Sequence, residues 1–184
     1  MAELGQGERV RHGPPPLAIT THSPPSVGHP LKYGTNLFPD LDGAVAAARQ
    51  AFFQLHELPL ELREAMISQI RRTARENAQV LAYQAWQETG LGRYEDKIQK
   101  NLLNANKTPG TEFLTPSVWT GDHGLSLVEW APFGVIGAII PSTNPTSTVI
   151  CNTIAMVAAG NAVVFNAHPG AKACSNHAVR LMNE

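Results

Sequence analysis

The run from Gly134 to Phe165, GVIGAIIPSTNPTSTVICNTIAMVAAGNAVVF, constrains the fold more than any other part of the chain. It begins with Val135 to Ile140, an apolar segment without polar alternation, which is typical of a parallel strand buried on both faces. A helical pattern follows and stops at Gly160, and Ala162 to Phe165 is a second β-rich segment. With a further helix over Ala171 to Glu184, this order predicts an α/β fold that holds the first βαβα units of a doubly wound, Rossmann-like sheet.

The turn after the first strand, PSTN at residues 141–144, is a candidate ligand site. Pro145 fixes one backbone angle and Thr146 or Ser147 is expected to cap the helix, so unpaired backbone N–H groups gather at this strand end. Doubly wound folds bind ligands at such an edge. The turn has neither a G-x-G-x-x-G pattern nor the lysine of a G-x-x-x-x-G-K-[ST] loop, so a standard dinucleotide or triphosphate loop is not supported. A plain strand-to-helix connection is the alternative.

Residues 1–36 are rich in Pro and Gly without sustained periodicity, which predicts a disordered leader. Helical patterns occupy 41–106 in four segments that start at Leu41, after Pro59, at Asn77 and at Arg93. The second segment has an expected apolar stripe of Leu62, Met66, Ile70 and Ala74, and the fourth has one of Tyr94, Ile98 and Leu102. Residues 108–124 are expected to be irregular, and 125–131 alternate as a strand that contains Trp130.

The stretch EWAPFGVIGAIIPSTNPTSTVICNTIAMVAAGNAVVFNAHPGAKACS resembles the aldehyde dehydrogenase superfamily. Its PSTNPT and VVFNAHPGA segments resemble the CoA-acylating branch, which includes the propionaldehyde and acetaldehyde dehydrogenases of bacterial microcompartments. Together with QETGLGRYEDKIQKN upstream, the resemblance covers residues 37–184, the N-terminal portion of such an enzyme. It implies a partial NAD-binding domain, a short aldehyde and CoA as substrates, and conversion to acyl-CoA and NADH through a cysteine thioester.

The resemblance also implies site residues. Asn144 is expected to donate a hydrogen bond to the developing oxyanion, and the alternative is that it only stabilises the turn before Pro145. The adenosine end of NAD, or CoA entering the same groove, is expected to contact the two strand ends. For His168, a backbone-bonded structural role is an equal alternative, and the absence of a lysine at Asn166 favours NAD over NADP. The expected cofactor-binding residues are Pro141, Ser142, Thr143, Asn166, His168, Pro169 and Gly170.

The family's nucleophilic cysteine lies downstream of the matching segment, so this chain alone is expected to be inactive. Its own thiols, Cys151 and Cys174, are expected to be structural, and Cys151 in particular is expected to be buried. Cys174 has the more activating surroundings, because Lys172 and His177 are near it in the sequence.

Composition excludes several classes of function. A formal net charge of -1 with 16% charged residues provides no basic face for nucleic acid, and no apolar run is long enough for a membrane span. The seven histidines show no metal-ligand spacing. We expect a cytoplasmic protein, a homo-oligomer at full length, with a bacterial microcompartment as a hypothesis for its location. The alternatives are a non-catalytic nucleotide-binding or assembly module and a non-acylating aldehyde dehydrogenase.

Overall fold

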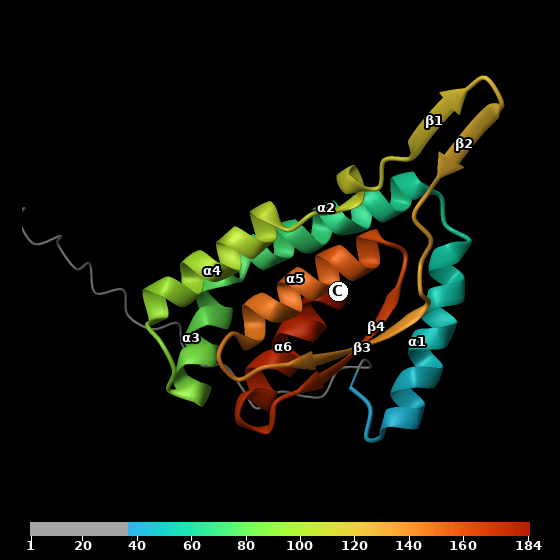
Figure 1. Cartoon of the computed structure of the whole chain (residues 1–184). Helices are drawn as coiled ribbons and strands as arrows, with labels where there is room; N and C mark the ends of the chain where they lie inside the picture. The colour runs from blue at the N-terminus through green and yellow to red at the C-terminus, as the bar shows by residue number, and fades with distance from the viewer. Residues whose placement is uncertain (1–36) are drawn as a thin grey trace, which may run out of the picture. The chain divides into compact units, whose positions relative to one another are not determined.

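The computed structural model describes residues 37–184, so the predicted leader over 1–36 lies outside the described residues. Four helices come first, as predicted (Figure 1). Asp40 caps the first of them, where its side chain accepts a hydrogen bond of 2.7 Å from the backbone N–H of Gly43. The helices are α1 (Leu41–His56), α2 (Leu60–Glu76), α3 (Ala78–Thr89) and α4 (Tyr94–Lys107).

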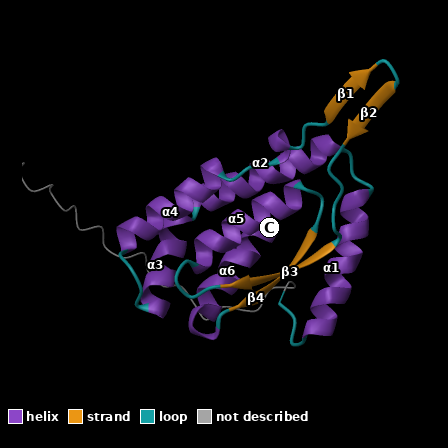
Figure 2. Cartoon of the chain, viewed as in Figure 1, coloured by secondary structure: helices purple, strands orange, loops and turns teal. Residues whose placement is uncertain are grey.

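The βαβα order over 134–184 is confirmed. Strand β3 (Val135–Ile140) leads into α5 (Pro145–Ala158), and β4 (Ala162–Ala167) then pairs in parallel with β3 before the chain ends in α6 (Lys172–Asn183). A 3₁₀ turn, η2 (Pro169–Ala171), joins β4 to α6. The register pairs Ile140 with Ala167, so the carboxyl ends of both strands lie side by side (Figure 2). In the part of the chain that the structure describes, the parallel sheet has two strands, as expected of an incomplete doubly wound domain.

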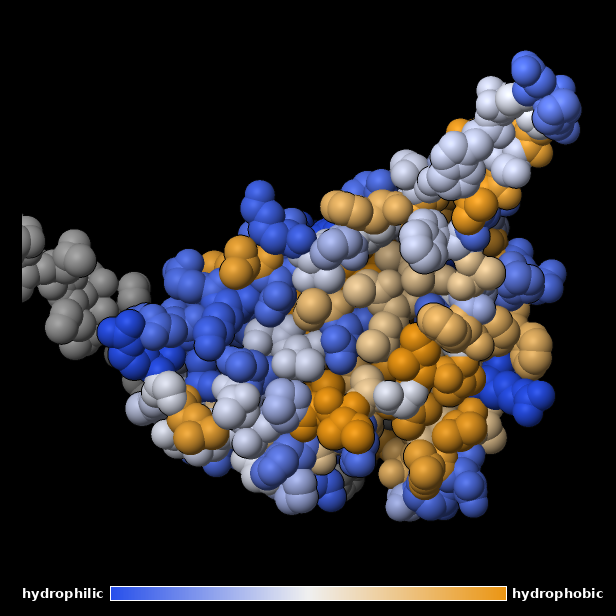
Figure 3. Space-filling model, viewed as in Figure 1, coloured by the Kyte–Doolittle hydropathy of each residue, from blue (hydrophilic) through white to orange (hydrophobic). Residues whose placement is uncertain are grey.

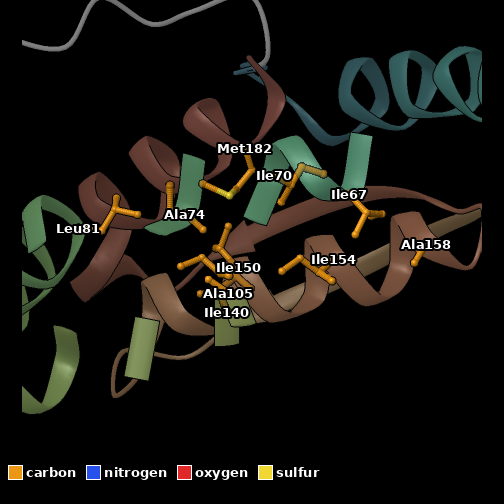
Figure 4. Close-up of a cluster of buried hydrophobic side chains, with 12 residues drawn as sticks. Ile67, Ile70, Ala74, Leu81, Ala105, Ile140, Ile150, Ile154, Ala158 and Met182 are labelled. Carbon is orange, nitrogen blue, oxygen red and sulfur yellow. The ribbon is translucent and has the colours of Figure 1, made fainter. Parts of the chain in front are cut away.

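The core lies between this sheet and the helices α2 to α6 (Figure 4). Ile140 of β3 and Ile150 and Ile154 of α5 are fully buried at its centre. On α2 the predicted stripe is half wrong: Ile70 and Ala74 are buried, but Leu62 and Met66 are exposed. Ile67 takes their place, because α2 turns the face that carries Ile67, Ile70 and Ala74 toward the core.

An antiparallel hairpin precedes the parallel sheet. It consists of β1 (Ser117–Gly121) and β2 (Gly124–Val128), and Gly124, at a φ of +140°, begins β2 directly after the tight turn at 122–123. A short 3₁₀ segment, η1 (Thr111–Phe113), leads into the hairpin. The prediction of an irregular segment over 108–124 was wrong for β1, since the strand that follows Pro116 and ends at Gly121 is too short for a clear alternation. The second strand ends at Val128, so Trp130 lies outside it.

Apolar side chains remain on the surface of the described residues. Every residue of β1 and β2 is exposed, as are Trp130, Phe133 and Ile139, with Phe133 at 95%. Figure 3 shows hydrophobic residues gathered where α1 and the parallel strands reach the surface. Exposure of apolar area to water costs roughly 25 cal/mol per Å², so burial of these side chains against another protein surface would be favourable. No helix among residues 37–184 is long and apolar enough to cross a membrane.

Candidate functional site

The structure brings the sequence-predicted site residues together at one edge of the parallel sheet. The turn at 141–144 follows β3 and the segment at 166–170 ends β4, and the backbone N–H of His168 donates to the carbonyl of Ile140 at 3.1 Å. Pro141, Thr143 and the four residues predicted on the second segment are exposed, while Ser142 and Asn144 are partly buried. The edge therefore presents accessible polar groups from two adjacent strand ends.

Asn144 occupies the N-cap position of α5, with Pro145 as the first helical residue. Its backbone carbonyl accepts hydrogen bonds from the N–H of Thr148 at 3.0 Å and from the Thr148 hydroxyl at 2.7 Å. Its side chain does not cap the helix. The prediction that Thr146 or Ser147 caps α5 was wrong: Thr146 donates to Asn101, and the Ser147 hydroxyl donates to the Asn144 carbonyl.

The two polar atoms of the Asn144 side-chain amide differ in how well they are hydrogen-bonded. Its Oδ1 accepts a hydrogen bond of 3.0 Å from Lys100 Nζ, whereas its Nδ2 makes only a long contact of 3.5 Å to the Thr143 hydroxyl. An N–H···O bond is strongest near 2.9 Å, so the Nδ2 donor is left with most of its capacity for another acceptor. The side chain is therefore arranged to offer a donor at the strand end.

One polar face of α4 contacts this turn and the start of α5. Lys97 Nζ donates to the Thr143 carbonyl at 3.2 Å, and Asn104 Nδ2 donates to the Ser147 carbonyl at 3.2 Å. Asn101, which is 1% exposed, accepts from the Thr146 hydroxyl at 3.0 Å and donates to the Ala78 carbonyl at 3.0 Å.

The buried residues of α4 are Lys97, Asn101 and Ala105, whereas the predicted stripe of Tyr94, Ile98 and Leu102 is only partly buried.

The sequence analysis did not identify this polar face as part of the site. A signal was present, since Lys97, Lys100, Asn101 and Asn104 recur at the i, i+3, i+4, i+7 spacing that places residues on one side of a helix. Polar residues at that spacing are usually solvated, so the pattern alone did not indicate contact with residues that lie 43 to 46 positions downstream.

The environment of the turn is electropositive. Lys97 is 7% exposed, and burial lowers the pKa of its ammonium group, with the nearby charge of Lys100 lowering it further. The dipole of α5 adds a partial positive charge at its N-terminus, which lies at the same place. Negative charge that develops beside Asn144 would therefore be stabilised.

A groove of about 340 Å³ opens beside Asn144 between α4 and α5. Its volume is in the range of small-molecule sites. Cys151 is partly exposed in its wall, so the prediction that this thiol is buried was wrong, because α5 turns that position toward the groove and away from the core. The lining residues are Lys100, Leu103, Asn104, Asn144, Ser147, Thr148, Cys151 and Asn152.

Cys174 has a different environment. Its side chain is 1% exposed, and burial, with the Glu88 carboxylate as a second cause, raises the pKa of the thiol to about 12. The activating surroundings inferred from Lys172 and His177 are therefore not realised. Glu88 of α3 instead caps α6, because its two oxygens accept from the N–H groups of Ala173 and Cys174 at 2.8 Å each.

His168 uses one ring nitrogen locally. Its Nδ1 accepts a hydrogen bond of 3.0 Å from the N–H of Gly170, which holds η2. This contact is the one expected of the structural alternative for His168, and it leaves Nε2 to carry the ring proton in the neutral form. Within residues 37–184, no group of three or more His, Cys, Asp or Glu side chains is arranged to hold a metal ion.

Parallel strands joined by a crossover helix, with polar groups at their carboxyl ends, define the chain as part of a doubly wound α/β domain. The model of the aldehyde dehydrogenase family matches residues 33–184, and the chain belongs to this family.

Two curated relatives show the branch to which it is similar. The acetaldehyde dehydrogenase (acetylating) EutE of Escherichia coli is 48% identical over 80% of this chain and 31% of its own length. The propanal dehydrogenase (CoA-propanoylating) of Citrobacter freundii is 45% identical over 82% of this chain and 33% of its own. Both are CoA-acylating aldehyde dehydrogenases, and the chain spans about a third of the length of each. It corresponds to their N-terminal portion.

Solved structures agree. A propionaldehyde dehydrogenase from the Clostridium phytofermentans fucose utilisation bacterial microcompartment matches with a TM-score of 0.78 and 51% identity, over 80% of this chain and 34% of that one. A Rhodopseudomonas palustris propionaldehyde dehydrogenase with bound CoA and an acylated cysteine matches with a TM-score of 0.78 and 46% identity, over 80% and 34%. An engineered glycolyl-CoA reductase with bound NADP⁺ matches with a TM-score of 0.79 and 44% identity, over 83% and 35%.

Proposed function

We propose that this chain is the N-terminal, cofactor-binding portion of an NAD-dependent, CoA-acylating aldehyde dehydrogenase. The whole enzyme would convert a short aldehyde, CoA and NAD to acyl-CoA and NADH through a cysteine thioester. The nucleophilic thiol would come from the region of the enzyme that lies downstream of this segment. The observation that carries the proposal is the Asn144 amide beside the groove: its Oδ1 is bonded by Lys100, and within residues 37–184 its Nδ2 makes only a long contact of 3.5 Å.

In this proposal Asn144 donates from Nδ2 to the carbonyl oxygen of the aldehyde as that oxygen gains negative charge. An amide suits the task because it stabilises an anion without transferring a proton. The groove between α4 and α5 would admit the aldehyde, with Leu103 as an apolar contact and Cys151 as part of the wall. Neither Cys151 nor Cys174 acts as the nucleophile.

The two strand ends would hold the nucleotide. Asn166 and His168 are exposed there, next to the turn at 141–143, and can bond hydroxyl or phosphate oxygens. NAD held there would supply the acceptor for the hydride that leaves the aldehyde adduct. Asn166 offers an amide and no cation for a 2′-phosphate, which supports NAD in preference to NADP. The same edge would admit CoA, which receives the acyl group.

A chimera tests the proposal. It joins this chain to the remaining two thirds of EutE of Escherichia coli, after the last aligned residue, with EutE itself as the control. We expect NADH formation from acetaldehyde or propionaldehyde only when CoA is present, and faster turnover with NAD than with NADP. A folded chimera that forms NADH equally well without CoA would indicate a non-acylating enzyme, and one with no activity would favour a non-catalytic module.

Asn144→Ala in the chimera isolates the oxyanion role. Loss of one such donor lowers kcat by about 10² to 10³. A kcat equal to that of the parent chimera would assign Asn144 to the turn alone.

The hairpin β1–β2 supports self-association in the whole enzyme. Its apolar side chains are exposed on both strands, among them Val118, Trp119, Leu125 and Leu127. We propose a cytoplasmic homo-oligomer that pairs through this hairpin, with a bacterial microcompartment as its location. Trp119→Ser should lower the oligomeric mass of the chimera in size-exclusion chromatography, and an unchanged mass would reject the hairpin as the contact.

A further inference from the structure

Two lysines on α4 hold two consecutive residues of the turn that carries Asn144. Lys97 Nζ bonds the Thr143 carbonyl at 3.2 Å, and Lys100 Nζ bonds the Asn144 Oδ1 at 3.0 Å. The lysines are three residues apart, so they project from the same side of the helix. One contact fixes the backbone of the turn and the other fixes the side chain.

The chemistry of the second contact determines which end of the amide is free. An amide side chain has two ends of nearly equal shape, an acceptor oxygen and a donor nitrogen. An ammonium group has donors only, so Lys100 can bond Oδ1 and never Nδ2. While this bond persists, the nitrogen of Asn144 is turned away from Lys100, and the oxygen cannot be presented to an anion.

The charge of Lys100 also acts on the strength of the donor. A cation bonded to the amide oxygen polarises the group and strengthens the hydrogen bond that its N–H makes at the other end. Lys97 polarises the peptide group between Thr143 and Asn144 in the same way, because its ammonium group is bonded to the carbonyl oxygen of that peptide group.

We propose that Lys100 is a positioning residue for Asn144, which holds the amide so that Nδ2 faces the reacting carbonyl. The inference rests on the proposed function of Asn144 as oxyanion donor. Lys100 is exposed and lines the groove, so the competing role is direct contact with a bound substrate. Positioning affects kcat, whereas substrate contact affects KM.

The kinetic test uses the EutE chimera. Lys100→Met removes the ammonium group, Lys100→Arg keeps a cation with donors only, and Lys107→Met is the matched control on an exposed lysine at the end of the same helix. We expect Lys100→Met to lower kcat by about 10-fold, a part of the 10² to 10³ that loss of the donor costs. KM for aldehyde and for CoA should stay within about twofold, and Lys100→Arg should restore most of kcat.

A double-mutant cycle gives the sharper comparison. If Lys100 acts through Asn144, Lys100→Met lowers kcat no further in the Asn144→Ala background. An equal loss in both backgrounds, or a change confined to KM for CoA, overturns the inference while leaving the oxyanion role of Asn144 intact. A normal kcat in Asn144→Ala instead removes the proposed role of Asn144 and this inference with it.

A measurement on the 184-residue chain is independent of turnover. With ¹⁵N-labelled asparagine, the Asn144 side-chain amide is the signal that disappears in Asn144→Ala. Its order parameter should be high in the parent and in Lys100→Arg and should fall in Lys100→Met. An order parameter that Lys100→Met leaves unchanged overturns the inference.

Discussion

Replacing Asn161 by alanine should destabilise the domain far more than its place in a loop suggests. The side chain is 2% exposed, and its Oδ1 accepts from the backbone N–H groups of Phe133 at 2.7 Å and Gly134 at 3.0 Å. Its Nδ2 donates to the Met156 carbonyl at 3.1 Å. One side chain thus ties the entry of β3 to the end of α5 and the start of β4.

The cost of Asn161→Ala follows from what each partner loses. The Gly134 N–H is left buried without an acceptor, which costs about 1 to 3 kcal/mol, and the Phe133 bond is worth roughly 0.5 to 1.5 kcal/mol. The Met156 carbonyl still accepts a hydrogen bond of 2.9 Å from the backbone N–H of residue 161, so loss of the Nδ2 bond to this carbonyl adds little. The sum is about 1.5 to 4.5 kcal/mol, and the middle of that range corresponds to a fall in Tm of roughly 6 to 12 °C.

Urea unfolding of the 184-residue chain, followed by far-ultraviolet circular dichroism, measures this difference. Asn183→Ala is the control, because Asn183 is exposed at the end of α6. Equal midpoints for the two variants, with equal m-values, would refute the argument that Asn161 holds the two strand starts together.

Two further predictions follow from burial and charge. Cys151 is partly exposed in the groove wall, so it should react with iodoacetamide in the native chain much faster than Cys174 does. Cys174 is protected because it is buried and the pKa of its thiol is raised to about 12. Equal reaction rates would contradict this prediction. Burial, then the charge of Arg180, lowers the pKa of His177, so the unfolded chain binds a proton more readily and the free energy of unfolding should fall as the pH drops below about 6.5. His177→Gln should flatten that part of the pH profile, and an unchanged slope would exclude His177 as its source.

Local patterns in the sequence were sufficient for the main elements. The strand from Val135 to Ile140 has the predicted bounds, because an apolar run between Gly134 and Pro141 leaves few alternatives. The crossover helix and the second strand followed from Pro145, Gly160 and β-rich spacing, and the PSTNPT and VVFNAHPGA segments indicated the family that the comparisons show.

Short or weakly patterned segments could not be predicted in the same way. Strand β1 has five residues, from Ser117 to Gly121, and it is defined by its pairing with β2 more than by its own composition. Half of the predicted stripe on α2 was wrong because Leu62 and Met66 are about as apolar as Ile67, and only the neighbouring helices decide which of them is buried.

The sequence by itself determined the order of strands and helices, the family, and the turn that carries Asn144. Tertiary structure alone decided how that turn is held, because Lys97 and Lys100 lie 46 and 44 residues from their partners. Periodicity shows that such residues share a helix face, but the identity of the surface opposite that face depends on how the helices pack. The same reason places Cys151 in a groove and Cys174 in the core, although both are single thiols on helices.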